Sequence, residues 1–416
     1  MNVQYFAAVT QPRRLGLLAQ GFMDWGGGLD FLRGIATGLR HADPTLELHV
    51  LVPMRGPLVT ARRLRDIARS VIRFHPITTH RPHHEHLERA MEGTGVVLHQ
   101  IDIGPRALAR TASRLQLDAL LPAFIPQATG KTPWVGYLYD FQHKHLPQFF
   151  TPQECARRDH DFAHMLNSAE AVIVNAHDVE RDIDHFFPKR RARIFTLPFS
   201  PSPGTEAFSV DPDDACRRHK ITGPYFIVCN QFWKHKDHGT VFKALALLVK
   251  RHPELSLVCT GATTDYRFPG YFDELMQEAS RDNIVDRIHT LGLIPKLDQL
   301  ALIRGAVALI QPTLFEGGPG GGAVYDAVAL GQSAIASDIP VNTEIDDPLV
   351  SFFQTGNATS LADAMSATWA QYATRATPPP PDELIARGIK RRHACGEVLL
   401  QAVAHAAAAH REAPST

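Results

Sequence analysis

The chain has 416 residues, too many for one ordinary hydrophobic core, so its length predicts two domains. Hydrophobic residues make up 44% and charged residues 21% of the sequence, which is typical of a soluble globular protein and argues against wholesale disorder. Lys plus Arg number 43 and Asp plus Glu also number 43, so the net charge gives no support to binding of a polyanion.

Short apolar runs alternate with helical patterns through the first half of the chain. Continuous apolar strands separated by helices indicate a parallel sheet covered on both faces. The strands are predicted at Arg14–Phe22, Leu46–Pro53, around Val96, around Leu117, at Pro133–Asp140 and at Ala169–Ala176.

Two segments between the second and third predicted strands have unusual composition. Ala61–Phe74 is a basic amphipathic pattern, which indicates either a helix on anionic lipid or a plain solvated helix face. Thr79–Gly93 carries four histidines, but the break at Pro82 and the lack of thiolates argue against a zinc site. No metal is expected.

The segment Arg193–Ser209 interrupts this rhythm with three prolines and a glycine, and the alternation then restarts. Two doubly wound domains joined near Pro198–Gly204 are the simplest account, with a loop at Ala376–Glu383 before a final helix. Such domains bind ligands at the carboxyl ends of their strands. The later strands are predicted in PYFIVCNQF, ELSLVCTGA, RIHTLGLI, VALIQPT and SAIASD.

The run LFEGGPGGGAVYDAVALG (Leu314–Gly331) follows one of these strands and precedes a helical pattern. Its glycines let phosphate approach the backbone, and the start of a helix offers free amides. The flanking acids Glu316 and Asp326 would repel phosphate but accept hydrogen bonds from hydroxyls. The pattern therefore predicts a nucleotide-sugar site, with a flexible glycine loop as the plain alternative.

Three segments carry a resemblance to a known family. PTLFEGGPGGGAVYDAVALGQSAIASDIPVNTEI resembles the donor-site signature of the family-4 retaining glycosyltransferases of GT-B fold, also called glycosyl transferases group 1. Tyr225–Leu248 is similar to the opening of that family's C-terminal domain. TPWVGYLYDFQHKHLPQFFTPQECARRDHDF resembles an N-domain segment of one subgroup. The resemblance covers most of the chain and is strongest over Tyr225–Ile345.

The resemblance implies an α/β fold with two Rossmann-like, doubly wound parallel-sheet domains that face each other across a cleft. The N-terminal domain, residues 1–200, would bind the acceptor. The C-terminal domain, residues 201–385, would bind the nucleotide sugar. A C-terminal helix, residues 386–416, would pack back towards the N-terminal domain.

The sequence departs from the family at several site positions. The second Glu of the signature would fall on Val324, and two extra residues shift the acid to Asp326, which we expect to accept ribose hydroxyls. The family's diphosphate-binding Lys is matched by Lys236, but its Arg position holds Gln231. Lys234 or a base elsewhere would have to replace that charge. A charge-assisted bond of this kind contributes about 1.5–3 kcal/mol.

The N-domain also departs from the family. A His-Asp pair usually ends the strand that faces the donor sugar, and here the pair is Tyr139-Asp140. His143 and His145 lie beyond it, and either could turn inward to bind a hydroxyl or relay a proton, although loop histidines commonly face solvent.

We therefore expect four catalytic residues: Glu316, Asp140, His143 and His145. The donor-binding set expected from the resemblance is Lys236, Gln231, Gly261, Ile294, Gly317, Gly318, Gly320, Gly321, Gly322, Asp326, Gly27 and Gly28. For Gly27 and Gly28, packing of a tight strand-helix turn is an equally good reading.

The implied activity is retaining transfer of a hexose, of mannose or glucose type, from a nucleoside diphosphate sugar to a glycan or glycolipid hydroxyl in cell-surface polysaccharide synthesis. No metal or cofactor and no nucleic acid are expected. A degenerate nucleotide-sugar-binding subunit and a sugar-nucleotide epimerase of similar fold are the alternatives. The donor base and sugar, the acceptor and the linkage stay open.

The five cysteines lie far apart without a C-x-x-C pair, which suits a reducing cytoplasm. MNVQYFAAVTQPRR lacks the pattern of a signal peptide, and no run approaches the roughly 20 apolar residues that span a bilayer. We expect a cytoplasmic protein, with peripheral contact at the inner face of the cell membrane as an open alternative.

Overall fold

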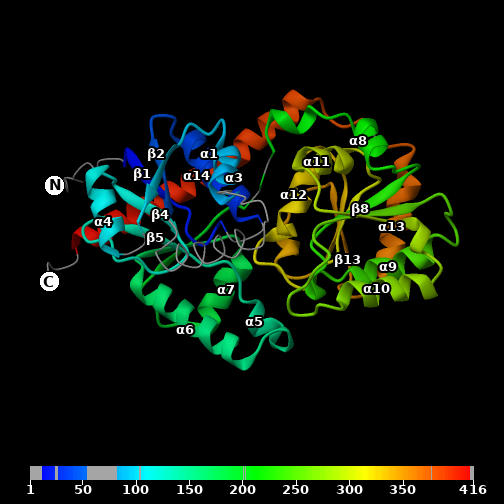
Figure 1. The fold of residues 1–416 in the computed structure, drawn as a ribbon, viewed down its shortest axis with the longest axis horizontal. Helices are drawn as coiled ribbons and strands as arrows, with labels where there is room; N and C mark the ends of the chain where they lie inside the picture. The colour runs from blue at the N-terminus through cyan, green and yellow to red at the C-terminus, as the bar shows by residue number, and fades with distance from the viewer. Residues whose placement is uncertain are drawn as a thin grey trace, which may run out of the picture.

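Two parallel β-sheets, one in each half of the chain, lie side by side (Figure 1). The structure is a computed structural model, and it describes residues 12–23, 27–53, 82–102, 105–199, 201, 203–375 and 377–412. The strand order is β3-β2-β1-β4-β5-β6-β7 in the first sheet and β10-β9-β8-β11-β12-β13 in the second. Two doubly wound parallel-sheet domains, expected from the sequence, are confirmed.

The first sheet forms from apolar runs that are buried on both faces, as parallel sheets require. β4 (Ala119–Ala123) and β6 (Ala171–Val174) are buried along their whole length. The other strands are β1 (Arg14–Leu18), β2 (Glu47–Pro53), β3 (Val97–Ile101), β5 (Trp134–Tyr137) and β7 (Arg193–Thr196). The helices of this half are α1 (Gly28–Ala42), α3 (Pro82–Met91), α4 (Pro105–Arg114), α5 (Gln142–His145), α6 (Pro152–Ser168) and α7 (His177–Phe186).

The second sheet is built in the same way around β8 (Tyr225–Cys229) and β9 (Ser256–Thr260), which pair in parallel along five residues each. Its other strands are β10 (Ile288–Gly292), β11 (Leu309–Gln311), β12 (Ala334–Ser337) and β13 (Val350–Phe353). The helices are α8 (Pro212–Arg218), α9 (His238–Leu248), α10 (Tyr271–Arg281), α11 (Lys296–Gly305), α12 (Ala323–Ala329) and α13 (Ala358–Tyr372).

Two strands were not expected from the sequence. β7 lies inside the segment that we interpreted as a break between domains, and β13 lies after the last predicted strand. Both are edge strands of their sheets. Edge strands are covered less, and β13 accordingly exposes Ser351 and Phe352, so neither shows the long apolar run that marks a central strand.

The last helix, α14 (Pro381–Glu412), links the two halves. It begins beside the second domain, where Arg391 pairs with Asp347, and runs back over the first domain to pack against α1 (Figure 1). At the crossing, a Cβ on Gly396 would lie 2.0 Å from the carbonyl oxygen of Gly38. Four residues of α14 join the core of the first domain: Leu399, Ala402, Val403 and Ala406.

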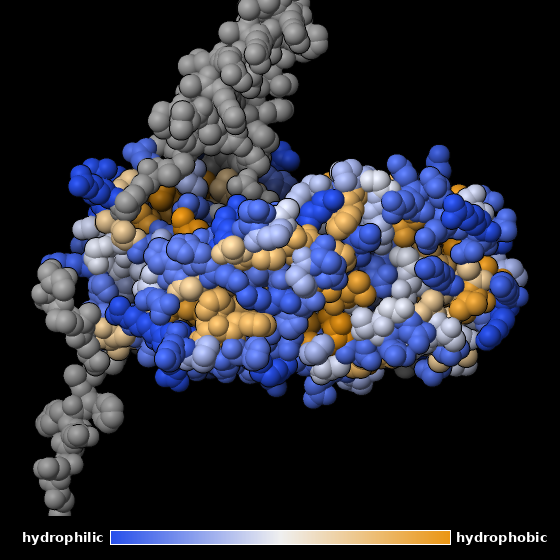
Figure 2. Space-filling model, turned by 90° about the horizontal axis from the view of Figure 1, so that it is seen from below, coloured by the Kyte–Doolittle hydropathy of each residue, from blue (hydrophilic) through white to orange (hydrophobic). Residues whose placement is uncertain are grey.

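The face in Figure 2 is hydrophilic over much of its coloured area, with smaller apolar patches between the polar ones. Of the helices that the structure describes, none combines the length and the apolar character needed to cross a bilayer. The basic pattern at Ala61–Phe74 lies outside the described residues, so a peripheral contact stays a prediction.

Candidate functional site

The glycine run lies where the two domains touch. A Cβ on Gly317 would lie 2.1 Å from the carbonyl oxygen of Tyr139 and 2.8 Å from the Cβ of Asp140. A Cβ on Gly318 would lie 3.2 Å from the Cβ of Asn175. Glycine is therefore needed here for close approach of the second domain to the carboxyl ends of β5 and β6.

Glu316 is held by a short network that starts at two strand ends. Lys236 Nζ donates to Glu316 Oε1, and Gln311 Nε2 donates to the same oxygen at 2.9 Å. Asn230 Nδ2 in turn donates to Gln311 Oε1 at 2.8 Å. The Lys236 and Glu316 side chains are only 14% and 10% exposed. Each therefore largely neutralises the charge of the other in a site from which most solvent is excluded.

Gln311 and Asn230 are functional candidates that our sequence reasoning missed. Gln311 is the last residue of β11, and Asn230 directly follows β8. Both are buried polar side chains at the carboxyl ends of otherwise apolar strands. That combination is a signal that sequence reading could have used, because buried polar groups need partners.

The second acid, Asp326, lies in α12 and pairs with Lys296, whose Nζ is 2.5 Å from Asp326 Oδ2. Burial raises the pKa of the Asp326 carboxyl, and Lys296 opposes that shift. Burial also disfavours the charge on Lys296, but Asp326 outweighs it, so the pKa of Lys296 is raised overall. Sequence reasoning did not predict Lys296 as a partner of Asp326. The predicted role of Asp326 towards ribose stays a prediction.

The glycine turn itself uses part of its backbone internally. Gly320, Gly321 and Gly322 have φ angles of 64°, 57° and 92°, a left-handed conformation that favours glycine. The amide of Gly320 donates to Asn342 Oδ1 at 2.9 Å, and the amide of Gly321 donates to the Gly318 carbonyl at 3.0 Å. In this conformation those two amides already have partners. Phosphate binding by the run stays a prediction.

The two N-domain histidines have different surroundings. His143 is buried, with its Nε2 2.9 Å from Asp159 Oδ1 in α6, and burial lowers its pKa although Asp159 opposes the shift. His145 instead stacks on Phe315, the neighbour of Glu316, with ring centroids 5.4 Å apart. The structure thus brings His145 to the glycine run and turns His143 towards α6.

Asp140 lies against the run, but its charge is also paired. Arg158 of α6 donates to both Asp140 Oδ1 and the Asp140 carbonyl oxygen. The guanidinium lies 4.9 Å from the centroid of the Tyr139 ring. Sequence reasoning missed Arg158, because its contact with Asp140 depends on how α6 folds back on the loop after β5.

Gly261 and Gln231 lie together at the carboxyl ends of β9 and β8. A Cβ on Gly261 would lie 2.4 Å from the Asn230 carbonyl oxygen and 2.8 Å from the Gln231 amide nitrogen. Ile294 is half-buried and lies two residues before Lys296. These positions lie at the same carboxyl edge of the second sheet as the glycine run. Their contact with a nucleotide stays a prediction.

The turn before α1 and the basic turn after β8 complete the candidate positions. A Cβ on Gly28 would lie 2.2 Å from the Phe22 carbonyl oxygen, so Gly28 is needed for packing of that turn. Gly27 has a φ of 95° with no described atom within 4 Å of a Cβ. Lys234 has its ammonium 4.6 Å from the centroid of the Phe268 ring.

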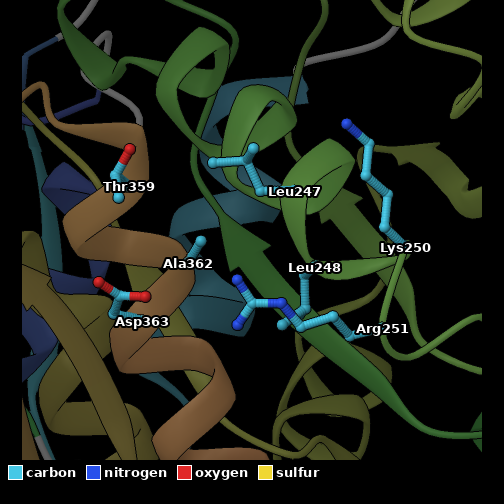
Figure 3. Close-up of a pocket in the computed structure, with 7 residues that line it drawn as sticks. All are labelled: Leu247, Leu248, Lys250, Arg251, Thr359, Ala362 and Asp363. Atoms are coloured by element: carbon cyan, nitrogen blue, oxygen red, sulfur yellow. The ribbon is translucent and has the colours of Figure 1, made fainter.

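A separate hollow lies in the second domain between α9 and α13 (Figure 3). Its volume is about 230 Å³, below the roughly 300–1,000 Å³ of typical ligand pockets. None of the candidate residues lines it. The lining residues are Leu247, Leu248, Lys250, Arg251, Thr359, Ala362 and Asp363.

The described part of the chain contains no cluster of three or more His, Cys, Asp or Glu side chains that could hold a metal ion. That the protein works without a metal nevertheless stays a prediction.

Two Rossmann-like domains with candidate residues at the carboxyl ends of both sheets define the GT-B fold of glycosyltransferases. The model of the family "Glycosyl transferases group 1" matches residues 213–376. A search of curated proteins gives no significant match to the chain.

Solved structures show the same fold over nearly the whole chain. HepE of Anabaena, solved with UDP and glucose, is 14% identical and aligns over 94% of this chain and 98% of its own, with a TM-score of 0.63. Sucrose-phosphate synthase of Thermosynechococcus elongatus is 16% identical over 94% and 97%, with a TM-score of 0.61. WaaG, a glycosyltransferase involved in lipopolysaccharide biosynthesis, is 11% identical over 91% and 94%, with a TM-score of 0.53. At these identities the likeness shows the fold.

Proposed function

We propose that the protein is a retaining, metal-independent glycosyltransferase that moves a hexose from a nucleoside diphosphate sugar to a hydroxyl of a glycan or glycolipid. The first domain binds the acceptor and the second binds the donor. The GT-B fold and the family match over residues 213–376 support the reaction class. The Lys236–Glu316 pair beside the glycine run is the observation that carries the proposal.

The pair offers the two kinds of group that a sugar nucleotide needs. A lysine ammonium binds phosphate as a point charge, and a carboxylate accepts hydrogen bonds from sugar hydroxyls. When the diphosphate takes over part of the hydrogen bonding of Lys236, the Glu316 carboxylate is released for the hexose. Gln311 keeps hold of Glu316 Oε1 during that exchange.

Transfer proceeds without a covalent enzyme intermediate. A carboxylate near the reacting sugar would otherwise suggest a double displacement, but Glu316 is expected to bind hydroxyls remote from the anomeric carbon, and its Oε1 still accepts a hydrogen bond from Gln311 when Lys236 turns to the diphosphate. The bond from the anomeric carbon to the phosphate oxygen breaks, and its electron pair goes to the phosphate. The acceptor oxygen bonds the same face of that carbon, and its proton passes to the departing phosphate. Lys236 stabilises the charge that develops there.

The donor base, the acceptor and the location of the protein follow by analogy. HepE was solved in complex with UDP-glucose, so UDP-glucose is the first donor to test. The involvement of WaaG in lipopolysaccharide biosynthesis supports a lipid-linked or cell-surface glycan as the acceptor class. A cytoplasmic protein, in peripheral contact with the inner face of the membrane, fits such an acceptor.

The experiment is a thermal-stabilisation screen of UDP, GDP and ADP, followed by donor turnover with the matching sugar nucleotides. Glu316→Gln should bind the nucleoside diphosphate as the wild type does and lose transfer by about 10- to 150-fold, the cost of a lost charge-assisted hydrogen bond. Glu278→Gln, on the exposed side of α10, is the matched control. Unchanged transfer in Glu316→Gln would remove Glu316 from the site.

A nucleotide-sugar-binding subunit without turnover is the second candidate. It is favoured by Asp140, whose charge is taken by Arg158, and by the neutral Gln231 at the family's Arg position. Titration calorimetry with nucleotides, run beside an assay of sugar release, separates the two functions. Binding without any release from the donor would favour the subunit.

A further inference from the structure

The glycine run has a lysine–carboxylate pair on each side. Lys236 and Glu316 form one pair, and Lys296 and Asp326 form the other. Lys296 is the first residue of α11, just after β10, and Asp326 lies in the helix that follows the glycine turn. Both pairs therefore stand at the carboxyl ends of the second sheet, where open α/β sheets bind their ligands.

The Lys296–Asp326 pair is asymmetric in exposure. The Asp326 side chain is only 12% exposed, whereas the Lys296 side chain is 47% exposed. A lysine ammonium has three N–H donors, and among the described residues Asp326 is the one hydrogen-bond acceptor of Lys296. The buried carboxylate thus anchors an ammonium that still has donors for a ligand.

The charge on Lys296 is supported from both domains. Asp326 favours the protonated ammonium from its own domain, and Asp30, in the first turn of α1, favours it from the other. Lys296 therefore lies close to the domain boundary and stays cationic at neutral pH. Asp30 is exposed, so its influence is screened by solvent and salt.

The second domain needs such a cation if it binds a diphosphate. Lys236 supplies one positive charge, while Gln231, at the end of β8, supplies none. The ammonium of Lys234 lies over the Phe268 ring, 4.6 Å from its centroid. Among the described lysines beside the run, Lys296 and Lys236 are the two that a buried carboxylate positions.

We propose that Lys296 is a second donor-binding residue that holds the diphosphate of the nucleotide, and that Asp326 positions it. Lys296 then fills the role that the neutral Gln231 leaves open. Asp326 acts on the diphosphate through Lys296, and the uridine measurements below test its predicted contact with the ribose. This inference rests on the proposed function, since it concerns the same donor site.

The test measures the affinity of the full-length protein for uridine, UMP and UDP by titration calorimetry, or for the guanosine or adenosine series if the thermal screen selects that base. In Lys296→Met the affinity for UDP should fall about 10- to 150-fold, as expected for a lost charge-assisted hydrogen bond, while the affinity for uridine stays the same. Lys296→Arg should keep most of the UDP affinity. Lys250→Met, at the separate hollow (Figure 3), is the control.

Asp326→Asn tests the positioning role through a double-mutant cycle. If Asp326 acts through Lys296, Asp326→Asn lowers UDP affinity in the wild type and has little further effect in Lys296→Met. A fall in UDP affinity that is equal in both backgrounds would overturn the positioning role. A fall in uridine affinity in both backgrounds would show that Asp326 also binds the ribose directly. Thermal unfolding of each variant checks that it is folded.

The outcomes separate the inference from the function on which it rests. If UDP binds, and Lys236→Met weakens it while Lys296→Met does not, the inference is overturned and the proposed function stands. If the wild type binds none of the nucleoside diphosphates, both the proposed function and the inference are wrong.

Discussion

Gly317 shows how much one missing side chain contributes to the domain boundary. Its position against the Tyr139 carbonyl, 2.1 Å from where a Cβ would be, leaves no room for a methyl group. The carbonyl belongs to the main chain, and the Asp140 Cβ, 2.8 Å from the same point, is the fixed base of its side chain, so neither neighbour can move aside freely. Any larger residue must therefore push the two domains apart at the site where we place the chemistry.

We predict that Gly317→Ala lowers sugar transfer strongly and leaves nucleotide affinity of the second domain nearly unchanged. The radius of gyration from X-ray scattering should increase, because the domains can no longer meet at this point. Gly270→Ala, where a Cβ meets no described atom within 4 Å, should change neither property. Wild-type transfer in Gly317→Ala would show that contact at this point is not needed.

His145 gives a prediction about pH. The hydrogen bond that His145 Nε2 donates to Asp182 Oδ2 at 2.8 Å raises the pKa of His145 above its unfolded value of about 6.5. A group whose pKa is raised in the folded state contributes stability below the unfolded pKa, and this contribution is lost as the pH rises through the folded pKa.

Asp182→Asn should therefore reduce the free energy of unfolding more at pH 5.5 than at pH 8.5. Urea denaturation of the wild type and the variant at both pH values is the measurement. The effect will be modest, because the His145 side chain is 43% exposed and solvent screens the pair. An equal loss at both pH values would exclude a titrating partner for Asp182.

At the scale of elements, helices α1 and α14 cross where each has a glycine. Because Gly396 in α14 and Gly38 in α1 have no side chains, the two helix backbones can approach more closely than they could with larger residues at these positions. Gly396→Ala should destabilise the protein by about 1–3 kcal/mol, the usual cost of overpacking. Chemical denaturation measures it.

Gly34→Ala is the matched control in α1, because a Cβ there meets no described atom within 4 Å. This variant should be stabilising by about 0.5–1 kcal/mol, since alanine favours a helix over glycine. If both variants behaved alike, the crossing would not depend on the small residue.

The sequence predicts elements best where burial is complete. β4, β6, β8 and β9 were recognisable as uninterrupted apolar runs, whereas the edge strands β7 and β13 were not. The same limit applies to the site. Spacing placed Glu316 and Lys236 at strand ends, but it could not show that Lys296, 30 residues from Asp326, is its partner. Nor could spacing tell His143 from His145, because α6 decides which of them is turned away from the boundary.

At the scale of the whole molecule, a side chain of the second domain caps a helix of the first. Glu344 Oε2 accepts from the His177 amide at 2.9 Å, and Oε1 accepts from the Asp178 amide at 2.6 Å. These amides open α7, where a carboxylate both fills free donors and complements the helix dipole. The contact favours the arrangement in which the domains touch.

Glu344→Ala should therefore loosen the domain arrangement at a cost of about 0.5–2 kcal/mol, as for other lost helix caps. We expect faster proteolysis near residues 198–204 and a larger radius of gyration without donor. Saturating nucleotide should reverse part of both changes if the donor site draws the domains together. Glu278→Ala is the control, and identical digestion of Glu344→Ala and wild type would exclude a role for the cap.

The path of α14 limits how this protein can be recombined with others. Four residues of α14 complete the core of the first domain: Leu399, Ala402, Val403 and Ala406. A fragment that stops near residue 200 would therefore expose the apolar surface that these residues cover. The two halves of the chain thus cannot be exchanged as independent units. A chimera that imports a foreign donor half should retain residues 381–412 from the same parent as the acceptor half.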